Sequence, residues 1–320
     1  MTQKANPKRA SPAVWSIVSF RVSGLFRISN FVLRIFRAMK IIHTIEDTRS
    51  SVAAARHEGK TVGLVPTMGY FHEGHLSLMR QARKDNDFVV VSLFVNPTQF
   101  GPNEDLRDYP RDMDRDARMA EEAGVDLIFN PSVEEMYPEG YQTYVAVEEM
   151  TKGLCGEFRS VHFRGVATVC LKLFNVVQPD RAYFGRKDYQ QLKVVTRMVK
   201  DLNVPLEIIG MPTVREPDGL AMSSRNTYLS PDEREAALVL SKSLAYAQEL
   251  LDSGITSGPE IECGVEQFIG REPLARIEYV SVVHPETLEP KAEICDEAVI
   301  ALAIRIGKTR LIDNGVIRNA

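Results

Sequence analysis

Residues 61–82 read TVGLVPTMGYFHEGHLSLMRQA, and this stretch decides the fold. The apolar, β-branched run at 61–65 predicts a strand that ends in a tight Pro-Thr-Met-Gly loop. Helical spacing resumes at Leu76, so His75 is expected near a helix N-terminus. Free backbone N–H groups at such a position favour a phosphate, and the imidazoles of His72 and His75 lie beside them. The pattern therefore indicates attack at a nucleotide phosphate.

The spacing of the two histidines also bears on other interpretations. A zinc site needs a third and a fourth ligand, and no cluster of Cys or His lies nearby in the sequence. His72 and His75 are three positions apart, which differs from the His-Glu-x-x-His pattern of metalloproteases. On this motif alone, two ordinary surface histidines stay an open alternative.

Composition and charge restrict the class of protein. The chain has 320 residues, of which 44% are hydrophobic and 26% charged, as expected for one large or two smaller globular domains. The formal charge is −4, and because residues 1–38 carry seven Lys or Arg and no acid, the rest carries −11. An acidic body argues against a nucleic-acid partner. The four cysteines form no CxxC pair, which predicts reduced thiols and a cytoplasmic location.

The segment 1–38 is basic, apolar and rich in Ser. Its arginines interrupt every apolar run before the length of about 18 residues that spans a bilayer, so we expect no stable membrane insertion. A transit peptide and an amphipathic helix on a membrane surface have this composition. A third interpretation is that translation begins at Met39. We favour the third, because the residues from Met39 onward begin a well-formed domain.

From Lys40 onward, expected strands and helices alternate. This alternation predicts an α/β fold, a Rossmann-like doubly wound parallel sheet with ligands at the carboxyl ends of its strands. We place this catalytic domain at 39–212 and a smaller C-terminal α+β lid domain at 213–320. The strands are expected at 61–65, 88–95, 126–129, 182–184, 206–210, 276–283 and 298–304; the helices at 75–84, 105–123, 166–177, 189–200 and 232–251; and a linker-like loop at 254–259.

Polar groups follow three further segments of this series. Asn96 and Gln99 follow a strand, where amides bind hydroxyl or carboxylate groups, although an Asn-Pro turn explains them equally well. The segment 184–191 offers a glycine for close approach, a phosphate-binding lysine and an acceptor for ribose hydroxyls; alone, it also reads as a solvated helix start. The segment 222–226 combines two hydroxyls with an arginine, which suits phosphate oxygens or a helix-capping loop. Two Gly-Lys-Thr triplets lack the glycine of a P-loop five positions upstream, where Ala54 and Leu302 stand, and no GxGxxG occurs.

Taken together, these motifs resemble one family. The set PTMGYFHEGH, FVNPTQFGPNED, YPRD, HFRGVATV, FGRKDYQQL and VREPDGLAMSSRN is similar to the pantothenate synthetase (pantoate–β-alanine ligase) family, within the HxGH nucleotidyltransferase superfamily. The resemblance covers roughly Lys40 to Ile317. It implies that pantoate attacks the α-phosphorus of ATP to give pantoyl adenylate and pyrophosphate, and that β-alanine then displaces AMP. It also implies Mg²⁺ accompanying ATP and a homodimer.

The resemblance assigns roles to residues of this chain by motif match. His72 and His75 would contact the ATP phosphates, and Lys187, Ser223, Ser224 and Arg225 would bind the pyrophosphate side. Gly185 and Asp188 would hold the ribose, with Val214 and Met222 on the nucleotide. Gln99 and Gln191 would bind pantoate, in a pocket closed by Met68. The weaker candidates are Asn96, Tyr109 and Arg159 for the second substrate and Asp116 for Mg²⁺.

Three departures from the family pattern are Phe71 for Leu, Arg186 for Glu and Arg115 for an acidic residue. None of them removes a group that the two half-reactions need. The nearest alternative is a nucleotidyltransferase of the same superfamily that transfers AMP to a phosphorylated acceptor. An RNA-binding relative of class I tRNA synthetases is disfavoured by the acidic body. A non-catalytic nucleotide sensor is disfavoured because the catalytic groups, such as His72 and Lys187, are all present.

Overall fold

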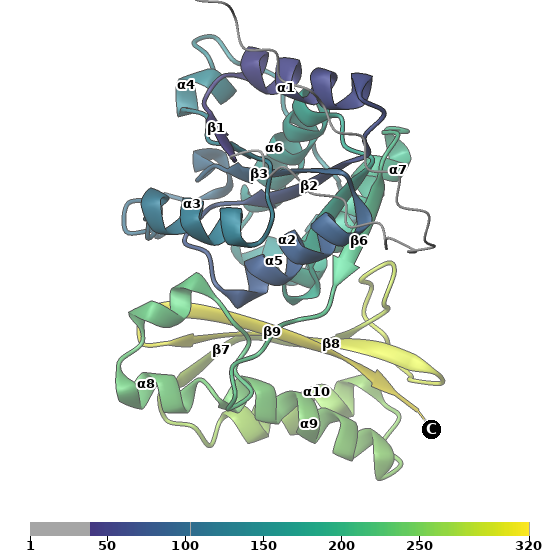
Figure 1. Cartoon of the computed structure of the whole chain (residues 1–320). Helices are drawn as coiled ribbons and strands as arrows, with labels where there is room; N and C mark the ends of the chain where they lie inside the picture. Colours follow the sequence, from purple (N-terminus) through teal and green to yellow (C-terminus); the bar gives the residue numbers. More distant parts are fainter. Residues whose placement is uncertain (1–38, 103, 320) are drawn as a thin grey trace, which may run out of the picture. The chain divides into compact units, whose positions relative to one another are not determined.

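The computed structural model describes residues 39–102 and 104–319, so the predictions for 1–38 lie outside the described residues. A six-stranded parallel sheet in the order β1-β4-β3-β2-β5-β6 forms the first part of this chain (Figure 1). Its strands are β1 (Lys40–Ile42), β2 (Val62–Thr67), β3 (Phe88–Leu93), β4 (Leu127–Phe129), β5 (Arg181–Gly185) and β6 (Glu207–Met211).

Helices cover both faces of this sheet, as a doubly wound fold requires. Leu64 and Val90 pack with α1, α6 and α7 on one face, whereas Val65 and Val91 pack with α2 and α3 on the other. All four side chains are fully buried, which explains the continuous apolar runs of these strands. The helices are α1 (Ile45–His57), α2 (Glu73–Asp85), α3 (Met113–Glu122), α4 (Val133–Met136), α5 (Cys155–Phe158), α6 (His162–Val177) and α7 (Tyr189–Asp201), with 3₁₀ turns η1 (Pro97–Gln99), η2 (Glu149–Thr151) and η3 (Arg186–Asp188).

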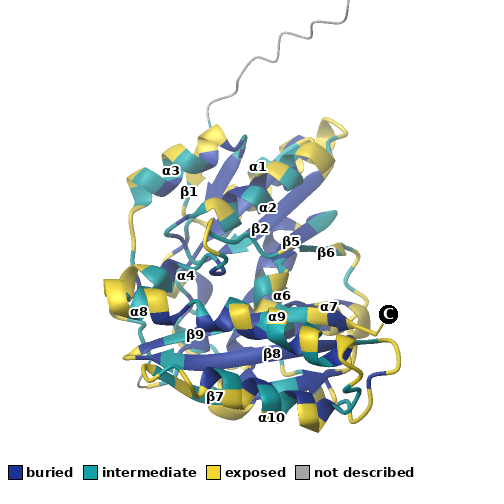
Figure 2. Cartoon of the chain, turned by 90° about the horizontal axis from the view of Figure 1, so that it is seen from below, coloured by how far each residue is buried: buried dark blue, intermediate teal, exposed yellow. Residues whose placement is uncertain are grey.

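A three-stranded antiparallel sheet follows in the order β7-β8-β9. Helices α9 and α10 cover one of its faces, and Figure 2 shows β8 in the buried colour. The elements are η4 (Ser224–Tyr228), α8 (Pro231–Ala236), α9 (Val239–Asp252), α10 (Gly258–Ile269), β7 (Ala275–Val283), β8 (Glu297–Ile306) and β9 (Thr309–Arg318). The predicted fold class, a Rossmann-like sheet with a smaller α+β part, is confirmed. Both sheets belong to one compact unit, so the division at residue 212 stays a prediction.

Several expected elements are wrong in extent. The helix expected at 105–123 begins only at Met113, because the side chain of Asp112 caps it there. The helix expected at 232–251 is two helices, since the hydrogen bond from Leu240 N–H to Ala237 O spans three residues and interrupts the helical pattern. The linker expected at 254–259 already contains the start of α10, capped by Ser257. Strand β9 was not predicted. Within the described residues, no helix is long and apolar enough to cross a membrane.

Candidate active site

A cavity of about 220 Å³ opens at the carboxyl ends of β2, β3 and β5. Its lining brings together every predicted site residue except Asp116. These residues are Met68, His72, His75, Asn96, Gln99, Tyr109, Arg159, Gly185, Lys187, Asp188, Gln191, Val214, Met222, Ser223, Ser224 and Arg225. The strand-end positions read from the sequence therefore form one site in the structure.

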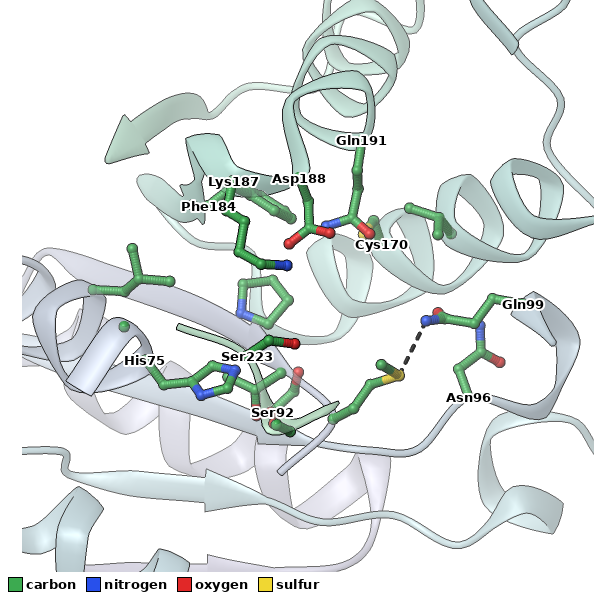
Figure 3. A pocket seen from close by; sticks show the side chains of 18 of the residues that line it. His75, Ser92, Asn96, Gln99, Cys170, Phe184, Lys187, Asp188, Gln191 and Ser223 are labelled. Atoms are coloured by element: carbon green, nitrogen blue, oxygen red, sulfur yellow. Dashed lines mark hydrogen bonds between the residues drawn. The ribbon is translucent and has the colours of Figure 1, made fainter. Parts of the chain in front are cut away.

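The polar side chains approach the cavity from opposite sides (Figure 3). Lys187 and Asp188 come from η3 and Gln191 from the start of α7, while His75 and Ser223 face them across the open space. Asn96, the N-cap of η1, and Gln99, the last residue of η1, close the far end. A cation, two imidazoles and several amides therefore surround a space suited to a phosphorylated ligand.

The backbone of the HxGH loop fixes the hydrogen position on both imidazoles. The N–H of His72 donates to Nδ1 of His75 at 3.3 Å, and the N–H of Gly74 donates to Nδ1 of His72 at 3.1 Å. A neutral imidazole has one N–H, so in each ring it must be on Nε2. Both histidines are thus prepared as Nε2–H donors while uncharged.

The environment keeps these imidazoles uncharged. Burial, followed by the positive charge of Lys187, lowers the pKa of His72 from 6.5 to about 4. Burial, and then the neighbouring His72 and Lys187, lowers the pKa of His75 well below 6.5. At neutral pH the positive charge in this group therefore comes from Lys187, and the two histidines supply hydrogen bonds.

Asp116 supports the same loop from behind. Its carboxylate accepts hydrogen bonds from the N–H groups of Tyr70 at 2.6 Å and Phe71 at 2.7 Å. Gly69 and Tyr70 both have left-handed backbone conformations, with φ of 88° and 52°, and a Cβ at Gly69 would lie 3.1 Å from this carboxylate. The guanidinium of Arg115 donates to the Phe71 carbonyl at 2.7 Å. The structure thus does not bring Asp116 into the cavity, and its two oxygens are engaged by the backbone.

Asn96, Gln99 and Met68 hold one another at the other end of the site. The amide of Asn96 donates to Gln99 Oε1 at 3.2 Å, and Gln99 Nε2 lies 3.0 Å from the sulfur of Met68. The hydroxyl of Tyr137 donates to Asn96 Oδ1 at 2.9 Å. The amide groups are therefore fixed before a substrate enters.

Two acidic residues that the sequence did not single out orient the arginines of the site. Nε and Nη2 of Arg225 donate to the two carboxylate oxygens of Asp105, both at 2.8 Å. Burial opposes the charged form of Asp105, but Arg225 outweighs this effect and lowers the pKa of that carboxyl. Arg159 pairs with Glu104: its Nε donates to both carboxylate oxygens at 3.1 Å, and its Nη2 also donates to Oε2. The sequence carries no signal that pairs these acidic residues with arginines so distant in the chain. The only hint is that two acidic residues, Glu104 and Asp105, are adjacent in it.

Ser224 and His162 make two further contacts, the first with the HxGH loop and the second with Gln99. Ser224 donates its hydroxyl to the carbonyl of Tyr70 at 3.2 Å, so this serine also supports the loop. His162, which sequence reasoning missed within the HFRG motif, lines the cavity and has Nδ1 3.0 Å from the Gln99 carbonyl. Since a carbonyl only accepts, the proton of His162 is on Nδ1. Burial and then Arg159 lower its pKa to about 3, so this ring is also neutral.

Comparisons with known proteins agree on one family. The family profile described as Pantoate-beta-alanine ligase matches residues 40–316. The chain is 56% identical over 279 residues to the pantothenate synthetase of Acetivibrio thermocellus, covering 87% of this chain and 99% of that protein. It is 57% identical over 279 residues to the enzyme of that name from Pelotomaculum thermopropionicum, with the same coverage of both.

Solved structures give the same result. The crystal structure of pantothenate synthetase from Thermus thermophilus matches with a TM-score of 0.82 at 50% identity, over 87% of this chain and 99% of that chain. The pantoate-beta-alanine ligase from Francisella tularensis, solved as a complex with beta-gamma ATP and beta-alanine, matches with a TM-score of 0.73 at 34% identity, over 87% and 98%.

Proposed function

Since the chain belongs to the pantoate–β-alanine ligase family, we propose that its cavity forms pantothenate through a pantoyl adenylate. A carboxylate oxygen of pantoate attacks the α-phosphorus of ATP, and the bond from that phosphorus to the bridging oxygen of pyrophosphate breaks. The β-alanine amine then attacks the acyl carbon, the C–O bond to AMP breaks, and the nitrogen loses a proton. The overall reaction, an ATP-dependent ligation of pantoate and β-alanine, is that of the family.

One observation supports the phosphate chemistry most directly. The two Nε2–H donors of His72 and His75 and the ammonium of Lys187 line one cavity, with both imidazoles neutral. Donors that are fixed before reaction stabilise charge as it develops, without reorganisation. We assign these three residues to the phosphates that gain negative charge when pyrophosphate leaves.

The other residues are assigned around this group. Asp188 and Gly185 take the ribose, and Val214 and Met222 the adenine side. Asp105 orients the planar guanidinium of Arg225, which suits it to bind the oxygens of pyrophosphate. Ser223 and Ser224 are assigned to the same oxygens. Gln99 and Gln191 receive the hydroxyl and carboxylate groups of pantoate next to Met68. The candidates for β-alanine are Asn96, Tyr109 and Arg159.

We also propose that Mg²⁺ binds together with ATP. Asp116 does not fit as its direct ligand in this arrangement, because both carboxylate oxygens already accept backbone N–H groups. Among the described residues, no group of three or more His, Cys, Asp or Glu side chains is suited to a metal ion. We therefore propose that phosphate oxygens and water hold Mg²⁺, which neutralises phosphate charge when bound, and that Asp116 positions the loop.

Assembly, location and domain motion are also proposals. We infer a homodimer from the family resemblance, which sedimentation would test. A cytoplasmic location agrees with four free cysteines. The lid role of residues 213–320 has support from Ser223, Ser224 and Arg225, which line the cavity from the segment before α8.

The test of the adenylate is exchange of labelled pyrophosphate into ATP. We expect exchange that requires pantoate but not β-alanine. The alternative, AMP transfer to a phosphorylated acceptor, predicts no pantoate dependence and instead a stable dinucleotide product. Exchange without pantoate would contradict the proposed intermediate.

A further inference from the structure

Strand β9 contacts the nucleotide-binding segment through one side chain. The amide Nδ2 of Asn314 donates to the carbonyl of Arg186 at 3.0 Å and to that of Lys187 at 2.7 Å. These two carbonyls belong to η3, the single 3₁₀ turn that presents Lys187 to the cavity. Asn314 thereby ties the edge strand of the antiparallel sheet (Figure 1) to the residue assigned to the ATP phosphates.

The turn at η3 lies between β5 and α7, and Nε of Arg186 donates to the Gly210 carbonyl on β6 at 3.1 Å, a bond that does not hold the carbonyls of the turn. Neither Gly185, which precedes η3, nor Asp188, which precedes α7, makes a side-chain cap. A short 3₁₀ turn has poor hydrogen-bond geometry and depends on outside contacts for its position. Lysine adds a flexible four-carbon stem, so the place of its ammonium depends on where the backbone is held. The two bonds from Asn314 restrain the backbone carbonyls of Arg186 and Lys187 directly.

The neighbouring residue, Asp313, makes Asn314 a well-fixed donor. Asp313 is buried, and its two oxygens accept from Nη1 and Nη2 of Arg215 at 2.6 and 2.9 Å. One of these oxygens also accepts the backbone N–H of Asn314 at 2.9 Å. Arg215 directly follows Val214, so adjacent positions of β9 hold both segments that border the nucleotide part of the cavity.

We propose that Asn314 is a positioning residue for Lys187. Asn314 determines where the lysine ammonium lies and does not itself touch substrate. This inference rests on the proposed role of Lys187 in binding the ATP phosphates. It assigns to the C-terminal sheet a direct part in ATP recognition, in addition to packing.

The experiment measures ATP affinity by calorimetry and the steady-state constants of Asn314→Ala, in the full chain. Two hydrogen bonds of ordinary strength correspond to about a 10-fold loss in ATP affinity or in kcat/KM for ATP. The KM for β-alanine should change much less. Asn314→Asp keeps the side-chain volume but turns an oxygen toward both carbonyls, so it should lose more than Asn314→Ala. If Asn314→Ala is too unstable to assay, Asn314→Asp provides the measurement in its place.

A matched control separates positioning from packing. Asn319→Ala removes a similar bond, from Nδ2 to the Ile294 carbonyl at 3.3 Å, beyond the end of β9 and away from the cavity. It should leave ATP affinity unchanged. In a double-mutant cycle, Asn314→Ala should cost little once Lys187 is already alanine, because its effect passes through that lysine.

Two results would overturn the inference. Wild-type ATP affinity in both Asn314 variants, with Lys187→Ala strongly impaired, would refute Asn314 while leaving the proposed function intact. Wild-type behaviour of Lys187→Ala would remove the assigned role of the lysine and, with it, the reason to position it. Full additivity in the cycle would likewise show that Asn314 acts independently of Lys187.

Discussion

The carboxylate of Asp116 accepts the backbone N–H of Tyr70 at 2.6 Å, although 46 positions separate them in the chain. Together with the bond to Phe71, this contact holds the loop in the left-handed conformation that directs His72 and His75 into the cavity. A side chain outside the cavity therefore shapes the catalytic group.

We predict that Asp116→Asn lowers kcat by about 10-fold or more, since an amide nitrogen would then face a backbone donor and leave it unpaired. Steady-state assays over a range of Mg²⁺ concentrations measure this effect. Asp114→Asn, an exposed residue on the same helix, is the matched control and should behave as wild type. Recovery of the rate at high Mg²⁺ would instead identify Asp116 as a metal ligand.

His75→Ala should slow pantoyl-adenylate formation by about 100- to 1,000-fold, the usual cost of losing one fixed donor to a developing charge. ATP affinity should fall much less, because the contact strengthens in the transition state. Single-turnover kinetics and ATP titration give the two quantities. His57→Ala, on an exposed helix end, is the control. An unchanged adenylation rate would be incompatible with the role assigned to His75.

The lowered pKa of His72 predicts a pH dependence of stability. The unfolded chain binds a proton near pH 6.5, whereas folded His72 binds one only near pH 4. Between these values the unfolded state holds more protons, so the free energy of unfolding decreases as pH falls, by at most about 1.4 kcal/mol per pH unit for this group.

Urea unfolding of wild type and His72→Asn at about pH 7 and about pH 5 measures this contribution. Wild type should lose more stability than the variant between the two conditions. Equal losses would show that His72 titrates normally in the folded protein.

Arg225→Lys should reduce pyrophosphate exchange by about 10-fold, because lysine keeps the charge but not the planar fork that Asp105 orients. The conservative change at Arg181, a half-buried arginine on β5 that pairs with Glu207 and lies outside the cavity lining, should have no effect. Wild-type exchange in Arg225→Lys would mean that charge alone is sufficient at this position.

Removal of residues 1–38 should leave kcat and both KM values unchanged, since the family match begins at residue 40 and the cavity is lined from Pro66 onward. Steady-state assays of the truncated chain give the comparison. A folded but inactive truncation would disprove the assignment of the whole site to the later residues.

The sequence predicted the parts of this protein that depend on local patterns. Apolar runs such as 88–95, which contains β3, and the loop after residue 65 identified the parallel sheet and the polar groups at its strand ends. What it did not predict depends on contacts between distant segments. The acidic loop residue Asp105 acquires a role only when folding brings it to Arg225, and Asn314 only when β9 reaches η3. Asp116 was predicted as a metal ligand from the family resemblance and the preference of Mg²⁺ for carboxylates, whereas the backbone of the HxGH loop already uses its oxygens.

The most direct test of the central claim is product analysis of the purified protein with ATP, Mg²⁺, pantoate and β-alanine, leaving out each in turn. We predict pantothenate, with AMP and pyrophosphate, only in the complete mixture. AMP transfer to another acceptor with no amide formed, or no pantothenate in the complete mixture, would contradict the account.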